Sequence, residues 1–232
     1  PNFDLTGAEF DEQDRLTSVS YVDDGRIAYR YFNDEHSAHA AKLQALYPGK
    51  TVVEIDRAAD GHVQLLNVSA NDDPGMAVLY HPQQAQLFSL GDYFPELRSY
   101  QRFPTQVLEV ESAPGVQLEA YLTRPAPAID NKVLLVMPHG GPVAVRDYNT
   151  FNSEVQYFVS RGFSVLRVNF RGSSGFGKKF IESGVGQFGQ QIEHDISAAV
   201  AKVRSQYAFA KSCAMGSSYG GYLATVMSAL RP

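Results

Sequence analysis

Residues 214–222 read Ala-Met-Gly-Ser-Ser-Tyr-Gly-Gly-Tyr and contain the pattern G-x-S-x-G, with Ser218 as its central serine. The apolar run at 212–215 is typical of the end of a buried strand, and residues 222–230 read as a largely apolar helix. A serine in a sharp turn between strand and helix presents its hydroxyl above the sheet, and flanking glycines let the two elements approach. The stretch therefore predicts a nucleophile elbow. The alternative is a glycine-rich turn whose serines have no catalytic role. The elements around the turn distinguish the two interpretations.

The composition is typical of a soluble globular protein. The 232 residues can form one large domain or two smaller ones. A hydrophobic content of 44% with many aromatic residues excludes a disordered chain. The formal net charge of -5 offers no basic surface to a phosphate backbone, so we expect no nucleic-acid partner. The longest apolar run, residues 133–137, has only the length of a strand, which excludes membrane insertion.

The single cysteine and the first residue bear on compartment and processing. Cys213 lies in an apolar strand, where we expect its thiol to be packed, and one cysteine forms no disulfide framework. We expect a cytoplasmic protein, with the periplasm as the alternative. The chain starts at Pro1 without a basic-then-apolar signal segment, so we expect that processing or a cut has removed the original start.

The first part of the chain reads as short strands joined by turns. The dipeptides Asp24-Gly25 and Asp60-Gly61 each lie between two strands, at a spacing that suits one blade of a β-propeller. A plain antiparallel sheet is the alternative. A break is expected at residues 72–75. The expected strands cover residues 16–22, 26–32, 51–55, 62–68, 76–80 and 86–90, with a short helical or irregular piece at 39–46.

Residues 91–104 contain two prolines and no clean periodicity, so we place a domain boundary there and divide the chain into 1–103 and 104–232. Beyond it, strands alternate with helices, which predicts an α/β fold with a parallel sheet covered on both faces. This context favours Ser218 as a nucleophile. The expected strands are 105–111 and 116–123, antiparallel around Pro114-Gly115, and then 132–137 and 163–170. The expected helices are 151–160 and an amphipathic 187–206 with Ile192, Ile196, Ala199, Val200 and Val203 on one side.

Three further stretches contain residues that could carry chemistry. The glycines of residues 137–142 follow the first central strand, where their N–H groups could form an oxyanion hole together with the N–H of Tyr219. Residues 171–177 are glycine-rich but match neither phosphate-binding pattern, so we expect a loop that lines the pocket. His36 and His39 lack further ligands, which favours an exposed polar turn over a metal site. We expect no cofactor and no metal.

These stretches together resemble the prolyl oligopeptidase family of serine peptidases, and most closely its acylaminoacyl-peptidase and dipeptidyl-peptidase branch. The resemblance rests on residues 138–142, 161–163, 169–177 and 216–222; it is strong over 104–232 and looser over 16–95. It implies the last blades of a propeller followed by the N-terminal part of an α/β-hydrolase domain. It also implies that the N–H groups of Tyr219 and Gly141 hold the oxyanion. The sequence departs from the family's pattern in having Phe188-Gly189 where we associate a tryptophan-glycine pair with that family, and in being too short for a full propeller.

The catalytic base is the missing part of this interpretation. In α/β-hydrolases the acid and the histidine follow the serine, but no Asp, Glu or His follows Ser218 here. His139 belongs to the glycine-rich loop and His194 to a helix, so neither takes the position of the base. We therefore expect a piece of a longer polypeptide, incomplete at both ends, with little activity of its own, because an unassisted serine is an ordinary alcohol.

The sequence favours a serine peptidase that releases acyl-amino acids or dipeptides from short peptides through an acyl-enzyme on Ser218. An esterase or other acyl hydrolase on the same fold is one alternative, because fold does not fix the substrate. A non-catalytic interaction protein that keeps the hydrolase framework is another. The oligomeric state is left open.

Overall fold

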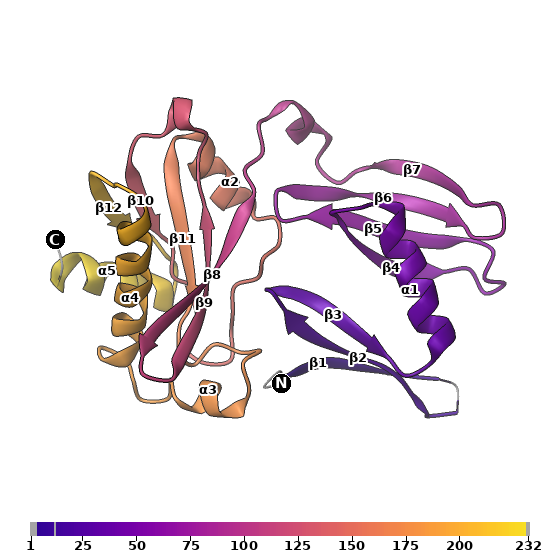
Figure 1. Cartoon of the computed structure of the whole chain (residues 1–232), viewed down its shortest axis with the longest axis horizontal. Coiled ribbons are helices and arrows are strands. Elements are labelled where there is room, and N and C mark those ends of the chain that lie inside the picture. Colours follow the sequence, from indigo (N-terminus) through magenta and orange to yellow (C-terminus); the bar gives the residue numbers. More distant parts are fainter. Residues whose placement is uncertain (1–3, 12, 231–232) are drawn as a thin grey trace.

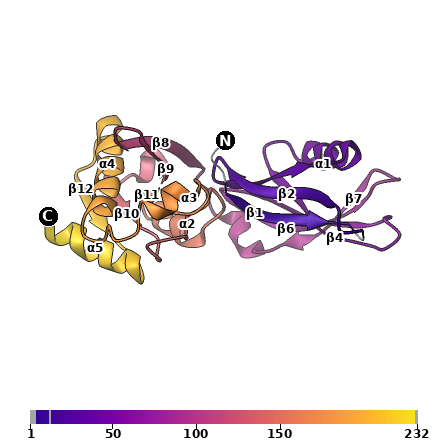
Figure 2. The ribbon, with the colours of Figure 1, turned by 90° about the horizontal axis from the view of Figure 1, so that it is seen from below.

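The structure is a computed structural model that describes residues 4–11 and 13–230. Figure 1 shows two lobes, one built from strands of the first part of the chain and one in which helices pack on a sheet. The view turned by 90° in Figure 2 shows the same lobes lying end to end. The order of a β-rich lobe followed by an α/β lobe confirms the fold class expected from the sequence.

The β-rich lobe contains two antiparallel sheets. Each is a meander in which neighbours in sequence are neighbours in space, the form of a propeller blade. The first sheet has the order β1-β2-β3 (Leu5–Phe10, Leu16–Asp23, Arg26–Tyr31). The second has the order β4-β5-β6-β7 (Thr51–Arg57, Gln64–Ala70, Asp73–His81, Gln86–Asp92). The sequence did not predict β1, whose side chains are all exposed and show no alternation of burial.

The two Asp-Gly turns exist but are not equivalent, so their spacing is not a repeat period. Asp24-Gly25 joins the last two strands of the first sheet, whereas Asp60-Gly61 lies between the first two strands of the second. The expected break at 72–75 is also shorter. β6 already begins at Asp73, and Gly75 adopts a φ of 98° within it.

Helix α1 (Asp34–Leu46) connects the two sheets and packs on the second. The Asn33 side chain caps it by accepting a hydrogen bond from the Glu35 N–H at 2.7 Å. Leu43 is its one buried residue and contacts the core of β5 and β6. The expected turn around His36 and His39 was therefore wrong. Both residues lie on this helix, which is polar on nearly every side and gives little periodic signal.

The α/β lobe has a five-stranded sheet in which parallel strands sit at the centre and one edge. The strand order is β12-β10-β11-β9-β8 (Lys211–Ala214, Val133–Val136, Phe163–Asn169, Val116–Thr123, Thr105–Ala113). β10 pairs in parallel with both β11 and β12, while β9 runs antiparallel to β11 and to β8. The expected hairpin and the expected parallel strands are both confirmed.

Alternate side chains of the central strands feed two separate cores. Leu134 and Val136 of β10 pack toward α4 (Gln191–Gln206) and α5 (Tyr219–Leu230). Leu135 packs on the other face against α2 (Ser153–Ser160). Because successive residues of a strand point to opposite faces, an uninterrupted apolar strand is what a doubly covered sheet requires. The apolar side predicted for α4 is correct, since Ile192, Ile196, Ala199 and Val203 are fully buried.

Two expectations for this lobe were wrong. The long helix begins at Gln191 instead of residue 187, because Gly189 adopts a φ of 74° and a turn closes from Gln187 to Gln190. A short helix, α3 (Lys178–Glu182), precedes it and was not predicted. Cys213 is exposed instead of packed, because β12 lies at the edge of the sheet. Partial burial still raises the pKa of its thiol.

Residues 93–104, which include the short 3-10 helix Pro95–Ser99, link the two lobes. Phe103 is buried among residues of the α/β core, and its backbone exchanges two hydrogen bonds with the Gln156 side chain on α2. The division between residues 103 and 104 remains a prediction. Among residues 4–11 and 13–230, no helix has both the length and the apolar character that crossing a bilayer requires.

Candidate active site

Ser218 occupies the turn between β12 and α5 in an unusual backbone conformation. Its φ is 52°, a left-handed value that is uncommon for any residue other than glycine. The turn is tight, because a Cβ atom at Gly216 would lie 2.5 Å from the backbone of Gly220. A Cβ atom at Gly220 would in turn lie within 3.0 Å of the Pro138 carbonyl oxygen. The sequence thus has glycine where strand, helix and the neighbouring loop leave no room for a side chain.

The glycine-rich loop after β10 lies directly beside this turn. A Cβ atom at Gly140 would lie 3.5 Å from the Ser218 Cβ and 3.3 Å from the Ser217 carbonyl oxygen. Gly141 follows with a φ of 71°. Tyr219 is the first residue of α5, so its N–H has no intrahelical acceptor and stays available to an anion. The loop and the N-terminus of α5 thus both lie beside one serine.

His139 of the same loop is fixed by three contacts. Its ring stacks on Phe170 with centroids 4.2 Å apart, and Nδ1 lies 3.0 Å from the Gly140 carbonyl oxygen. Nε2 lies 3.0 Å from the Ser173 hydroxyl. A carbonyl oxygen can only accept, so Nδ1 carries the proton and Nε2 accepts from Ser173. Burial lowers the pKa of His139, which keeps the imidazole neutral. The Nε2 lone pair is therefore engaged by Ser173 and is not available to accept a proton from Ser218.

Residues 171–177 hold the glycine-rich loop from the other side. They are not among the residues that line the cleft beside the serine turn, contrary to the expectation of a pocket-lining loop. The Ala144 N–H donates to the Gly172 carbonyl at 2.8 Å, and the Ser174 N–H donates to the Val145 carbonyl at 3.2 Å. A cleft of about 350 Å³ opens beside the turn, with Pro138, His139 and Gly140 on one wall and Met215 and Gly216 on another. The glycine-rich loop and the serine turn thus line one cleft.

A buried ion pair anchors this second loop to α4. Asp195 is fully buried and accepts hydrogen bonds from Arg171 at its backbone N–H (2.9 Å), its Nε (2.8 Å) and its Nη2 (2.6 Å). Asp195 was not predicted as part of the site, and Ser173 was predicted only as a member of the loop 171–177, not as the partner of His139. The sequence gives no direct signal for them, because their partners are distant in the chain.

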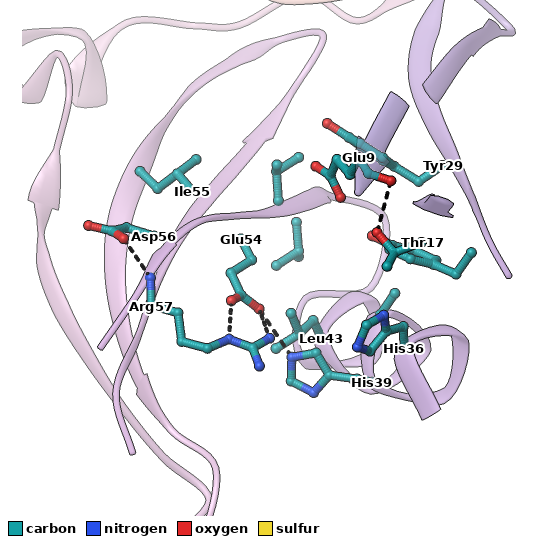
Figure 3. Close-up of a pocket in the computed structure, with 14 residues that line it drawn as sticks. Glu9, Thr17, Tyr29, His36, His39, Leu43, Glu54, Ile55, Asp56 and Arg57 are labelled. Atoms are coloured by element: carbon teal, nitrogen blue, oxygen red, sulfur yellow. Dashed lines mark hydrogen bonds and ion pairs between the residues drawn. The ribbon is translucent and has the colours of Figure 1, made fainter. Parts of the chain in front are cut away.

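Among the described residues, no histidine is hydrogen-bonded to Ser218. In that part of the chain the Ser218 hydroxyl has no hydrogen-bond partner, and His194 lies on the exposed side of α4. His36 and His39 lie in the other lobe, at a cavity of about 420 Å³ between the two sheets and α1 (Figure 3). There His39 and Arg57 both point to Glu54, with Nε2 to Oε2 3.2 Å and Nε to Oε1 2.5 Å. Among residues 4–11 and 13–230, no three His, Cys, Asp or Glu side chains are grouped to hold a metal ion.

Comparisons with known proteins find relatives of this sequence. The model of the prolyl oligopeptidase family matches residues 149–232. The chain is 32% identical over 218 residues to dipeptidyl aminopeptidase BIII of Pseudoxanthomonas mexicana, covering 90% of this chain and 31% of the relative. It is 37% identical over 128 residues to the acylamino-acid-releasing enzyme of Sus scrofa, covering 52% of this chain and 17% of that enzyme.

The fold is shared with solved structures as well. The acylaminoacyl peptidase of Pyrococcus horikoshii superimposes with a TM-score of 0.69 at 17% identity, over 97% of this chain and 35% of that one. Most of this chain is matched in these two comparisons, but it spans only about a third of the length of the dipeptidyl aminopeptidase and of the Pyrococcus enzyme. The family match shows that residues 149–232 belong to the prolyl oligopeptidase family, and the blade-like sheets and the α/β lobe have the fold of its solved relatives.

Proposed function

We propose that residues 1–232 belong to a serine peptidase that cleaves short peptides through an acyl-enzyme on Ser218. The observation that carries the proposal is the left-handed Ser218 at the N-terminus of α5, in contact with the loop of Gly140 and Gly141. In this geometry the hydroxyl attacks the scissile carbonyl. The N–H groups of Tyr219 and Gly141 hold the oxyanion that forms. Peptidases are also the relatives that match the chain.

The proposed triad is completed by an aspartate and a histidine from outside these 232 residues. His139 is excluded as the base, because its Nε2 already accepts from Ser173. Without a positioned imidazole, the oxyanion hole and substrate binding alone give only ~10³- to 10⁴-fold acceleration over water. The 232-residue chain alone is therefore expected to hydrolyse aminoacyl anilides and activated esters barely or not at all.

The substrate is proposed to be a short peptide from which a dipeptide or an acyl-amino acid is released. The match to the dipeptidyl aminopeptidase extends over 90% of the chain and therefore includes the β-rich lobe, whereas the acylamino-acid-releasing enzyme matches over 52%. The longer sequence match to the dipeptidyl aminopeptidase supports dipeptide release as the first activity to test. We also propose that the catalytic lobe begins at residue 104.

The test uses a polypeptide in which residues 1–232 are followed by the segment that supplies the acid and the base. Initial rates on a dipeptidyl anilide, an acetyl-aminoacyl anilide and a nitrophenyl ester distinguish the two peptidase activities from an esterase. Ser218→Ala should lower kcat by at least ~10³-fold. Ser217→Ala is the matched control and should keep most of the activity.

Two results would overturn the proposal. Ester hydrolysis without anilide hydrolysis would identify an esterase. A full-length protein whose Ser218 is not labelled by a fluorophosphonate would be a non-catalytic relative, because only an activated serine reacts. Full turnover by the 232-residue chain, lost in Ser218→Ala, would refute the part of the proposal that places the base outside it.

A further inference from the structure

The two lobes meet at the hairpin turn between β2 and β3, which reaches the α/β lobe in Figure 1. Asp24 and Gly25 form this two-residue turn with φ values of 49° and 72°, as a type I′ turn requires. The Gly25 carbonyl accepts from the Asn149 N–H at 2.8 Å, and the Asp24 carbonyl accepts from the Asn149 Nδ2 at 3.3 Å. One asparagine therefore recognises both carbonyls of the turn.

The turn is seated so closely that only glycine fits. A Cβ atom at Gly25 would lie 2.7 Å from the Asn149 Cβ and within 3.0 Å of the Tyr121 hydroxyl. By contrast, a Cβ atom at Gly61, in the turn between β4 and β5, would meet nothing within 4 Å. Both glycines have φ near 70° (72° and 69°), so they differ in their surroundings and not in their backbone.

Asn149 also holds the second sheet. It is 3% exposed, and its Oδ1 accepts from Nδ2 of Asn71, in the turn between β5 and β6, at 2.8 Å. The same Asn71 nitrogen donates to the Thr105 carbonyl at 3.0 Å. Every polar atom of the Asn149 side chain is thus directed at the β-rich lobe. A single buried residue joins both blade-like sheets to the α/β lobe.

A buried ionic network beneath the turn holds the Asn149 loop. The Arg146 side chain is 2% exposed; its Nη2 lies 2.5 Å from Glu119 Oε1 and donates to the Tyr121 hydroxyl at 3.1 Å. Its Nε donates to the Asp147 carbonyl at 3.0 Å and its Nη1 to the Ser174 carbonyl at 3.4 Å. This one guanidinium connects β9, its own loop and residues 171–177.

The same loop begins at the serine turn. Going back along the chain from Asn149, the Asp147 N–H donates to Asn169 Oδ1 at 2.8 Å, and the Ala144 N–H donates to the Gly172 carbonyl at 2.8 Å. Gly140 then lies beside Ser218. Asn149 and the glycine-rich loop are therefore joined by one short, hydrogen-bonded segment.

We infer that the Asp24-Gly25 turn is an intramolecular docking element. Asn149, which binds this turn, is then a positioning residue for the glycine-rich loop of residues 137–142, called the oxyanion loop below. The inference rests on the proposed function, because the loop matters for catalysis only if Ser218 is the nucleophile. The β-rich lobe then does more than cover the site. Its seated turn holds the Gly141 N–H where the oxyanion forms.

Hydrogen exchange on the 232-residue chain tests the docking without any activity. Gly25→Ala and Asn149→Ala should each speed exchange of the Ala144 and Asp147 amides by at least ~10-fold, since these bonds close only while the loop is held. Gly61→Ala is the matched control, because Gly61 has nearly the same φ but its new Cβ atom would contact nothing in the α/β lobe. Amides of β5 and β6 should keep their wild-type rates in all three variants, which separates undocking from global unfolding.

A double variant tests whether the two residues act through one contact. Because Gly25→Ala already removes the turn from Asn149 and leaves only the Asn71 contact to be lost, adding Asn149→Ala should speed exchange by less than Asn149→Ala does in the wild type, whereas the effects of Gly61→Ala and Asn149→Ala should multiply independently. Unchanged Ala144 and Asp147 exchange in Gly25→Ala would overturn the docking. So would equal effects of Gly25→Ala and Gly61→Ala.

Kinetics on the longer polypeptide test the positioning role. Asn149→Ala should lower kcat by ~10²-fold with KM within two-fold, the pattern of a group misplaced by about 1 Å in the transition state. A change in KM alone would refute a positioning role. If the wild type shows no Ser218-dependent hydrolysis, the proposed function fails, and the exchange results still decide the docking.

Discussion

The Nε2 atom of His139 accepts a hydrogen bond from the Ser173 hydroxyl across 3.0 Å, which ties the two loops of the candidate site together. The arrangement requires a neutral ring, and burial lowers the pKa of His139 below its ordinary value. The unfolded chain takes up a proton on this residue below about pH 6.5, and the folded protein does so only at lower pH. The free energy of unfolding should therefore fall as pH is lowered from about 6.5 to 5.

Urea unfolding at several pH values measures this slope in the wild type and in His139→Gln. The variant cannot gain the proton, so its free energy of unfolding should fall less over the same window. Other titrating groups contribute equally to both proteins and cancel in the difference. Equal slopes would show that His139 is not held neutral by the fold.

Asp195→Ala should destabilise the protein by about 3–5 kcal/mol, because it leaves the Arg171 guanidinium and backbone N–H unpaired in a buried site. The matched control is Glu182→Ala, which removes an exposed pair with Lys178 at 3.6 Å and should cost less than about 1 kcal/mol. Chemical denaturation measures both. A loss of similar size in the two variants would mean that Asp195 does not anchor the loop.

The elements that depend on local pattern could be predicted from the sequence. The apolar side of α4 follows from 3.6-residue periodicity, and the Asp24-Gly25 hairpin follows from turn chemistry. Helix α1 could not be delimited, because it buries only Leu43 and so lacks a periodic apolar face. Cys213 was misjudged because residue type indicates burial, whereas exposure depends on the place of β12 in the sheet.

The residues of the candidate site also fall into those that the sequence could predict and those that it could not. Ser218 and the loop of Gly140 and Gly141 could be located from the sequence, because their glycines and their order along the chain are local features. Asn149 and Ser173 could not, since each acts on a partner that only the folded chain brings near. A polar residue in a loop has many possible partners, and the sequence alone does not choose among them.

Gly220→Ala should destabilise the protein by about 2 kcal/mol or more, and Gly221→Ala should be nearly neutral. Both glycines lie in the first turn of α5, where alanine gains helix propensity of about 1 kcal/mol or less. The new Cβ at Gly220 would meet the Pro138 carbonyl within 3.0 Å, whereas the one at Gly221 would lie 3.1 Å from the Gly216 carbonyl. In Gly220→Ala the overlap with the Pro138 backbone outweighs the gain in helix propensity. In Gly221→Ala the slightly short contact does not outweigh it. Thermal unfolding of the two variants compares them directly, and equal stabilities would show that the oxyanion loop does not press on the helix.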